Sequence, residues 1–283
     1  MPKVLFRVLL MVLIPGLVSF SFVSTQTVNA DSSGDFLEGP APPGANDPDC
    51  RPDEEHPEPV VLVPGTFETM AQNWAVLAPF LSKKGYCVYA LNYGFSKAGP
   101  STGPIEESAS ELKAFVEQVL AHTGAEKVSI VGHSQGGMMP RYYLKFLGGA
   151  GNVEDLIGLA PSNHGTEGLA GLKATWPAVD LFSCAACRQQ QAGSEFLRKL
   201  NEGEEAPGSV SYTVVATRTD EVVVPCTSGF LKGPPSRVAN ITLQDVYPYD
   251  QVEHLGIPYD PHAFQFVLDA LAHPGPADPD RVR

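Results

Sequence analysis

Basic residues are scarce in this chain. Its 283 residues include 19 lysines and arginines against 32 aspartates and glutamates, which gives a formal net charge of −13. Proteins attach to nucleic acids and anionic membranes largely through positive charge, so this balance argues against either partner. Charged residues make up 18% of the chain and hydrophobic residues 43%, so a large core can form. The composition therefore favours a soluble protein with a neutral substrate.

A long uninterrupted apolar run is also missing. The longest candidate, residues 8–23, is short for a membrane span and contains a Pro-Gly pair. It follows Lys3 and Arg7 and precedes the small residues of positions 28–30, the order found in secretory signal peptides. An uncleaved anchor is the alternative. We predict that residues 1–30 are a signal peptide and that the protein is secreted, with no stable membrane anchor.

Cysteines are few, and their number is odd. A secreted protein uses its cysteines mostly in disulfides. Cys184 and Cys187 could form a redox or half-zinc motif, but no second ligand pair has a suitable spacing, which favours a short disulfide. Cys50 precedes the first expected core strand and Cys87 begins the second, and adjacent parallel strands would bring them together. Cys226 is then the free thiol.

Cofactor motifs and internal repeats are absent from the sequence. It contains no phosphate-binding loop, no metal-spaced cluster of His, Cys or Asp, and no dinucleotide fingerprint. We therefore expect no cofactor and no metal, although so many carboxylates leave a structural calcium ion as an alternative.

Residues 128–137 are the most informative stretch. A short apolar run ends in a Gly-x-Ser-x-Gly pattern, and an apolar helical pattern follows. This order of strand, sharp turn and helix is typical of the nucleophile elbow of hydrolases. Gly132 and Gly136 would remove side chains that collide where strand and helix converge. Ser134 would then project from the turn, and the N–H of Gln135 would face the site where an oxyanion forms.

Short apolar runs alternate with helical patterns along most of the chain. In addition to the elbow strand, strands are predicted at residues 59–63, 86–91, 155–160, 210–216 and 238–243. Helices are predicted at residues 73–84, 104–121 and 261–271. Such alternation predicts an α/β fold with a mostly parallel sheet of about six strands and helices on both faces. Pro140 should distort the helix that follows the elbow.

The predicted domain organisation is simple. Residues 31–58 are rich in Pro and acidic residues and have no apolar period, which indicates an extended arm. Residues 59–274 form one catalytic domain, and residues 275–283 a tail. Residues 165–207 carry no strand pattern. We interpret them as a helical insertion over the carboxyl edge of the sheet, either a lid or acyl pocket or simply part of the core.

A serine nucleophile needs a base within hydrogen-bond reach, and the base needs an acid to orient it. In the α/β-hydrolases these follow the serine in the order acid, then histidine. Asp220 is the expected acid because it follows the strand at 210–216, and its neighbour Glu221 is the alternative. His254 is the expected base because it lies between the last strand and the closing helix, and His262 and His273 are the alternatives.

Four further polar residues have predicted places. An oxyanion hole needs two donors, and Gln135 and Thr66, which follows the first core strand, would supply them. His133 should face away from the partners of the nucleophile. His164 lies upstream of the acid and should line or support the site.

At these residues the sequence resembles the secreted class 2 lipases of actinobacteria, within the α/β-hydrolase superfamily. The likeness covers residues 59–271 and is strongest over residues 131–143, Val-Gly-His-Ser-Gln-Gly-Gly-Met-Met-Pro-Arg-Tyr-Tyr. The sequence is also similar to Candida antarctica lipase B in four short stretches, at residues 62–66, 134–137, 160–161 with 165–166, and 219–223.

The resemblance implies an α/β-hydrolase fold that cleaves carboxylic esters, including acylglycerols. It implies a triad of Ser134, Asp220 and His254, with Thr66 and Gln135 as oxyanion donors. Many bacterial relatives have His-Gly where this chain has Pro64-Gly65. That difference keeps the backbone donor and favours a role for the threonine hydroxyl.

Three classes of function are compatible with these residues. The first is a secreted lipase or carboxylesterase, expected to be a monomer, that acts through an acyl-enzyme on Ser134. The second keeps the triad but cleaves another bond, as a polyester hydrolase, thioesterase or amidase does. The third, a non-catalytic binding protein on a hydrolase scaffold, is disfavoured because all three triad residues and both oxyanion positions are present.

Overall fold

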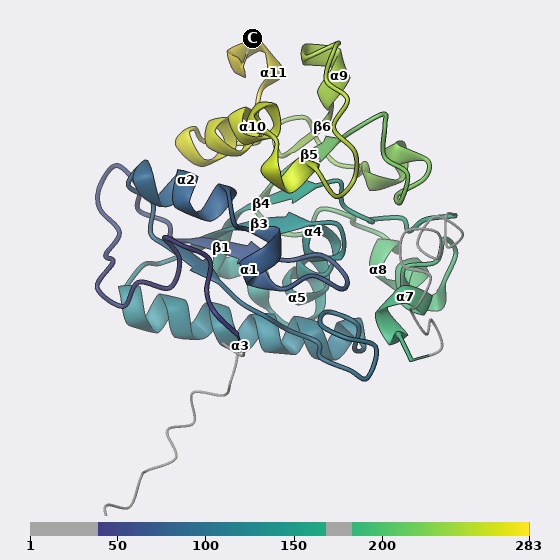
Figure 1. The fold of residues 1–283 in the computed structure, drawn as a ribbon, viewed down its shortest axis with the longest axis horizontal. Helices are drawn as coiled ribbons and strands as arrows, with labels where there is room; N and C mark the ends of the chain where they lie inside the picture. The colour runs from purple at the N-terminus through teal and green to yellow at the C-terminus, as the bar shows by residue number, and fades with distance from the viewer. Residues whose placement is uncertain (1–38, 168–182, 283) are drawn as a thin grey trace, which may run out of the picture. The chain divides into compact units, whose positions relative to one another are not determined.

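A computed structural model of the chain describes residues 39–167 and 183–282 (Figure 1). A six-stranded sheet runs through them in the order β2-β1-β3-β4-β5-β6, and every neighbouring pair is parallel. The strands are β1 (Val60–Val63), β2 (Val88–Ala90), β3 (Val128–His133), β4 (Val153–Leu159), β5 (Ser211–Ala216) and β6 (Val238–Thr242). The prediction of an α/β fold built on a parallel sheet is confirmed. The predicted signal peptide and residues 168–182 of the predicted insertion lie outside the described residues.

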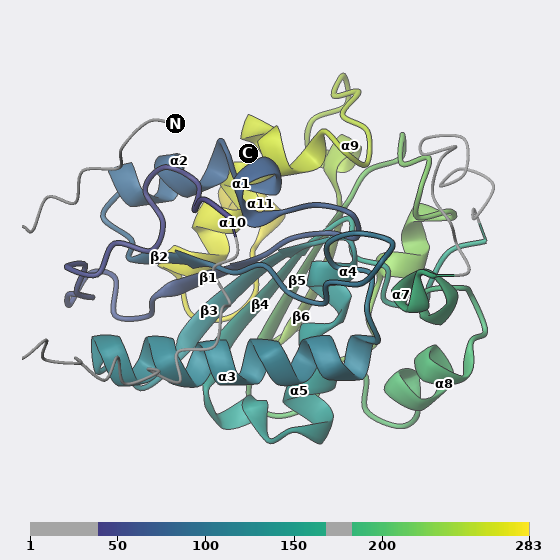
Figure 2. The ribbon, with the colours of Figure 1, turned by 60° about the horizontal axis from the view of Figure 1, so that its bottom comes forward.

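Helices cover both faces of the sheet (Figure 2). One face carries α3 (Ile105–Thr123) and α5 (Pro140–Phe146), and the other carries α1 (Met70–Asn73), α2 (Leu77–Lys83) and α10 (Pro261–Ala272). The side chains of β1 alternate between the two layers: Val61 and Val63 belong to the same core as the apolar stripe of α3, and Val60 and Leu62 to the core of α2 and α10. A strand buried on both faces has to be apolar throughout, which is why β1 is a continuous apolar run.

One predicted helix is divided in two, and a second is interrupted at the predicted place. The helix expected over residues 73–84 begins earlier, at Met70, because Thr69 and Gln72 form a capping box at its start. It then breaks, and α2 begins at Leu77. The helix after the elbow is interrupted as expected: α4 (Gln135–Met138) ends before Pro140, the first residue of α5.

The remaining described elements are short. The part of the predicted insertion that is described contains α7 (Ala185–Gln189) and α8 (Glu195–Asn201). The other short elements are η1 (Gly149–Gly151), η2 (Cys226–Gly229), α9 (Leu243–Val246), η3 (Ile257–Tyr259) and α11 (Pro279–Val282). The predicted tail is thus helical at α11, and its Arg281 pairs with Asp269 of α10 at 2.8 Å.

The described part of the predicted arm, residues 39–58, is tied to the edge of the sheet. The N–H of Asn46 donates to the carbonyl of Val88 at 2.9 Å. A disulfide joins Cys50 to Cys87 beside β2, and a second joins Cys184 to Cys187 at the start of α7. Cys226 is in neither bond, and burial raises the pKa of its thiol, so it stays protonated at neutral pH.

No helix within the described ranges is both long and apolar enough to cross a membrane. The segments that follow β1, β3, β5 and β6 all begin at the carboxyl edge of the sheet. Parallel strands bring such segments together, and this edge is where open α/β sheets place their sites.

Candidate active site

Ser134 lies in a strained turn between β3 and α4. Its backbone has φ 53° and ψ −120°, a combination that non-glycine residues rarely adopt. A Cβ atom on Gly132 would lie 1.9 Å from the carbonyl oxygen of Gly136, and one on Gly136 would lie 2.1 Å from the carbonyl oxygen of Val63. Only glycine fits at either position, so the two glycines let strand and helix approach closely on either side of the serine.

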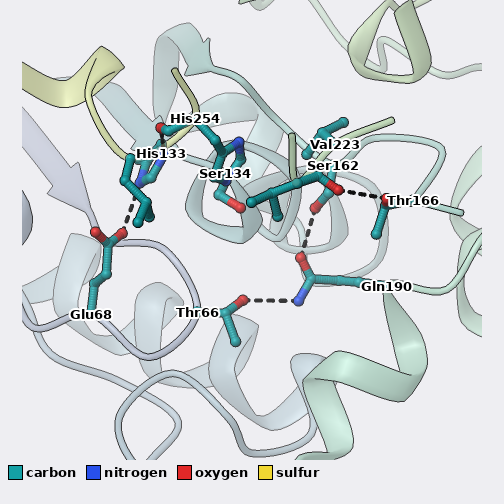
Figure 3. Close-up of a pocket in the computed structure, with 11 residues that line it drawn as sticks. Thr66, Glu68, His133, Ser134, Ser162, Thr166, Gln190, Val223 and His254 are labelled. Carbon is teal, nitrogen blue, oxygen red and sulfur yellow. Dashed lines mark hydrogen bonds and ion pairs between the residues drawn. The ribbon is translucent and has the colours of Figure 1, made fainter. Parts of the chain in front are cut away.

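Ser134 lines a pocket at the carboxyl edge of the sheet (Figure 3). Its polar lining includes Ser134, His254 and Thr66, the residues predicted as nucleophile, base and oxyanion donor. The other lining residues are Glu68, His133, Ser162, Thr166, Gln190, Val222, Val223 and Leu255. Residues predicted from separate stretches of sequence therefore meet in one place.

Asp220 holds the ring of His254. Its Oδ2 lies 2.9 Å from Nδ1 of the imidazole, and its Oδ1 accepts the backbone N–H groups of Val222 and Val223 at 2.8 and 2.7 Å. The side chains of His254 and Asp220 are 3% and 1% exposed, so water does not compete for this contact. A carboxylate only accepts hydrogen bonds, so the proton of a neutral His254 lies on Nδ1 and leaves the lone pair of Nε2 available to accept a proton.

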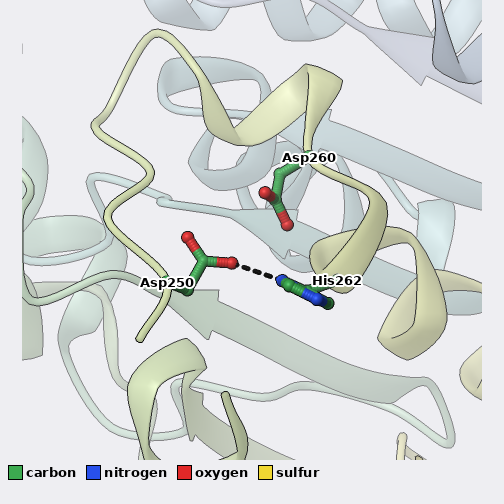
Figure 4. A group of neighbouring side chains, drawn as sticks. All are labelled: Asp250, Asp260 and His262. Carbon is green, nitrogen blue, oxygen red and sulfur yellow. Dashed lines mark hydrogen bonds and ion pairs between the residues drawn. The ribbon is translucent and has the colours of Figure 1, made fainter. Parts of the chain in front are cut away.

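The alternatives for acid and base have other partners. Glu221 accepts the backbone N–H of His254 at 3.3 Å and does not contact the ring nitrogens. His262 pairs with Asp250 at 2.6 Å, next to Asp260, outside the residues that line the pocket (Figure 4).

The Asp250, Asp260 and His262 group is the one within the described ranges whose spacing could hold a metal ion. Its two carboxylates already accept hydrogen bonds from the backbone. Asp250 accepts the N–H of Val252, and Asp260 accepts the N–H of Ala263, each at 2.8 Å. The third candidate base, His273, lies beside Asp269 of its own helix, with 3.2 Å between Nδ1 and Oδ1.

The prediction that His133 faces away from the partners of Ser134 is wrong. Its Nε2 donates to the backbone carbonyl of His254 at 2.9 Å, and the two rings lie 4.9 Å apart. Its Nδ1 lies 2.8 Å from Oε2 of Glu68. The side-chain amide nitrogen of Asn73 lies 3.2 Å from the same Nδ1. The Glu68–His133 pair thus fixes the main chain that carries the base.

The loop after β1 is held just before Thr66. The N–H of Gly65 donates to Oδ1 of Asn73 at 2.8 Å, and the hydroxyl of Tyr93 donates to the carbonyl of Pro64 at 2.7 Å. Tyr93 is buried, which raises the pKa of its phenol far above its usual range and keeps the proton for this bond. The hydroxyl of Thr66 donates to Oε1 of Gln135 at 2.7 Å. Both predicted oxyanion residues are therefore adjacent and restrained.

Several residues of the pocket were not foreseen. Glu68, Ser162 and Gln190 belong to no stretch that the sequence analysis matched, and Thr166 lies in such a stretch but had no assigned role. Tertiary packing brings all four to the pocket. His164 does not line it. Its Nδ1 donates to the carbonyl of Ser228 at 2.9 Å, which supports the neighbouring loop.

The comparison with known families agrees with this geometry. The sequence profile of the family described as Lipase (class 2) matches residues 57–267. The chain belongs to the class 2 lipase family. The predicted resemblance to class 2 lipases and the predicted α/β-hydrolase fold are confirmed.

Similar proteins include two curated triacylglycerol lipases. That of Pseudarthrobacter phenanthrenivorans is 40% identical over 90 residues, which cover 30% of this chain and 27% of that protein. That of Vibrio cholerae is 31% identical over 165 residues, 51% of each chain. This class 2 lipase family member thus spans about half or less of the length of the curated relatives it matches.

Two solved structures share its fold. Aspergillus fumigatus lipase B has 25% identity and a TM-score of 0.69, over 81% of this chain and 55% of that chain. Mature lipase BlEst2 of Bacillus licheniformis has 18% identity and a TM-score of 0.60, over 79% of this chain and 95% of that chain, a likeness of fold alone.

Proposed function

We propose that this protein is a secreted serine ester hydrolase, a lipase or carboxylesterase that acts on neutral acyl esters such as acylglycerols. The observation that carries the proposal is the pocket in which Ser134 and His254 meet, with Asp220 held 2.9 Å from the histidine ring. Family membership supports the same reaction, and the two disulfides suit an oxidising compartment.

In the first half of the reaction, Nε2 of His254 takes the proton from Ser134 as Oγ attacks the ester carbonyl. Asp220 stabilises the imidazolium that forms. The carbonyl oxygen becomes an oxyanion, which the N–H groups of Thr66 and Gln135 and the hydroxyl of Thr66 stabilise. When the C–O bond of the ester breaks, His254 gives the proton to the leaving alcohol, and the acyl group stays on Ser134.

In the second half, water replaces the alcohol. His254 removes a proton from the water molecule, and the hydroxide attacks the acyl carbon. The bond between the acyl carbon and Ser134 Oγ then breaks, and His254 returns the proton to the serine. The carboxylic acid leaves, and the net change is hydrolysis of one ester bond.

The test is an activity assay with p-nitrophenyl esters of graded chain length, beside emulsified triolein, for the wild type and Ser134→Ala. We expect ester cleavage by the wild type and a loss of about 10⁴-fold or more in kcat for the variant, because the nucleophile is removed. Activity that survives in Ser134→Ala would end the assignment. Cleavage of acetate and butyrate esters without triolein hydrolysis would identify an esterase rather than a lipase.

A further inference from the structure

Gln190 occupies the wall of the pocket opposite the nucleophile. It is the C-cap of α7 and is 6% exposed. Its Nε2 lies 2.9 Å from both the hydroxyl oxygen of Thr66 and Oε1 of Gln135. Its Oε1 accepts the hydroxyl of Ser162 at 2.8 Å. One side chain thus contacts both proposed oxyanion residues and is itself fixed by Ser162. Figure 3 shows its contacts with Thr66 and Ser162.

The Thr66 hydroxyl is occupied in this arrangement. It has one proton, and that proton goes to Oε1 of Gln135 at 2.7 Å. To stabilise an oxyanion, the hydroxyl has to turn away from Gln135. Without a second donor, this turn would leave a buried oxygen of Gln135 unpaired. The amide of Gln190 carries two protons, and its Nε2 lies closer to these two oxygens, at 2.9 Å each, than to the carbonyl of Ala186, at 3.3 Å. Gln135 therefore keeps a donor when Thr66 turns.

We propose that Gln190 is a positioning residue that lets the Thr66 hydroxyl switch from Gln135 to the oxyanion. The inference rests on the proposed ester hydrolysis and assigns a part in it to a residue from the insertion. The N–H of Gln190 that points at Oγ1 also holds that oxygen in place while its proton turns. Hydrogen bonds in such a chain polarise one another, so the hydroxyl becomes a better donor.

The helix that presents Gln190 is firmly held. The Cys184–Cys187 disulfide closes its first turn. The N–H of Ala186 donates to the carbonyl of Thr102 at 3.2 Å, and Oε1 of Gln189 accepts the N–H of Ile105, the first residue of α3, at 2.8 Å. The amide of Gln190 is thus placed against Thr66 before any substrate arrives, as preorganisation requires.

The experiment compares the kcat and KM of Gln190→Ala and Gln190→Glu with those of the wild type on a soluble p-nitrophenyl ester. Gln191→Ala is the matched control, because Gln191 is the same residue type one position along but is exposed. We expect kcat to fall about 10- to 100-fold in Gln190→Ala with KM within about 2-fold, because the contact matters only in the transition state. Thermal unfolding of each variant shows whether the fold is kept.

Gln190→Glu separates positioning from packing. Glutamate has the same size, but its carboxylate has no proton for Thr66 and would itself accept the Thr66 hydroxyl. It also places negative charge beside the forming oxyanion. We expect a larger loss of kcat than in Gln190→Ala. A Gln190→Glu enzyme with the kcat of the wild type would overturn the inference.

A double-mutant cycle with Thr66→Val completes the test. If Gln190 acts through the Thr66 hydroxyl, adding Gln190→Ala to Thr66→Val costs less than about 2-fold in kcat. Losses that simply multiply would overturn the inference. Ser134→Ala in the same assay keeps the two hypotheses apart: its inactivity upholds the hydrolase, whatever the Gln190 variants do.

Discussion

At the scale of single residues, two neighbouring carboxylates have separate tasks. Asp220 contacts the ring of His254, and Glu221 contacts only its backbone N–H. We predict that Asp220→Asn lowers kcat by about 10³–10⁴-fold, because the amide neither fixes the required tautomer nor stabilises the imidazolium. Steady-state kinetics on a p-nitrophenyl ester measure the effect.

Glu221→Gln is the matched control for that substitution. Gln keeps an acceptor for the N–H of His254, and the side chain is exposed, so we expect a loss below about 10-fold. If Glu221→Gln lowered kcat more than Asp220→Asn, the acid of the triad would be Glu221 and not Asp220.

The limits of the sequence are clearest at this scale. The order of serine, acid and histidine along the chain was enough to choose Asp220 and His254. His133 was misjudged because the contact depends on how the loop carrying His254 folds back over the end of β3, 121 residues earlier. Gln190 meets Thr66 across 124 residues, and no spacing rule reaches so far. Such contacts follow from packing, which a local pattern does not contain.

At the scale of elements, period and turn chemistry carried most of the prediction. β1 was the clearest strand because a run buried on both faces is apolar throughout. The start of α1 was missed although its signal is local: Thr69 followed three residues later by Gln72 is a capping-box pattern. Pro140 was interpreted correctly because a ring without an N–H has few places in a helix.

The two disulfides should differ in what they support. Cys50–Cys87 closes a loop with a sequence separation of 37, and Cys184–Cys187 one with a separation of 3. Loop entropy then gives stabilisations of about 4 and about 2 kcal/mol. We predict that replacing Cys50 and Cys87 by serine lowers Tm strongly with little change in kcat.

Replacing Cys184 and Cys187 by serine should affect kcat more than Tm. Tm falls less, but kcat falls because the helix that positions Gln190 loosens. Calorimetry and kinetics on both double variants give the comparison. Equal kcat in the two double variants would show that the Cys184–Cys187 disulfide does not support the active site.

At the scale of the whole molecule, an acidic group at the far end of the sheet links stability to pH. Asp155 lies near the amino end of β4 and is 6% exposed, with Ser129 donating to it at 2.9 Å. Burial, with added repulsion from Glu154 and Glu58, raises the pKa of Asp155 from 3.8 to about 7.

A carboxyl with a raised folded-state pKa holds its proton more tightly in the folded chain than in the unfolded chain. Its contribution to stability is therefore lost as pH rises from about 4 through about 7. Asp155→Asn carries no such charge and can still accept from Ser129. We predict equal Tm for variant and wild type near pH 4, and a variant more stable by up to about 4 kcal/mol at pH 8. A Tm difference that is constant across this range would refute the linkage.

The central claim is that Ser134 forms the covalent intermediate after His254 removes its proton. Reaction with an activated alkyl phosphonate ester, followed by peptide mass spectrometry, tests this claim most directly. Attack of the serine oxygen on the phosphorus atom needs the same nucleophile, base and oxyanion donors as ester hydrolysis. We predict one adduct on the peptide that contains Ser134, with labelling slowed at least about 10³-fold in His254→Ala. An adduct on any other residue, or labelling at the wild-type rate in His254→Ala, would contradict it.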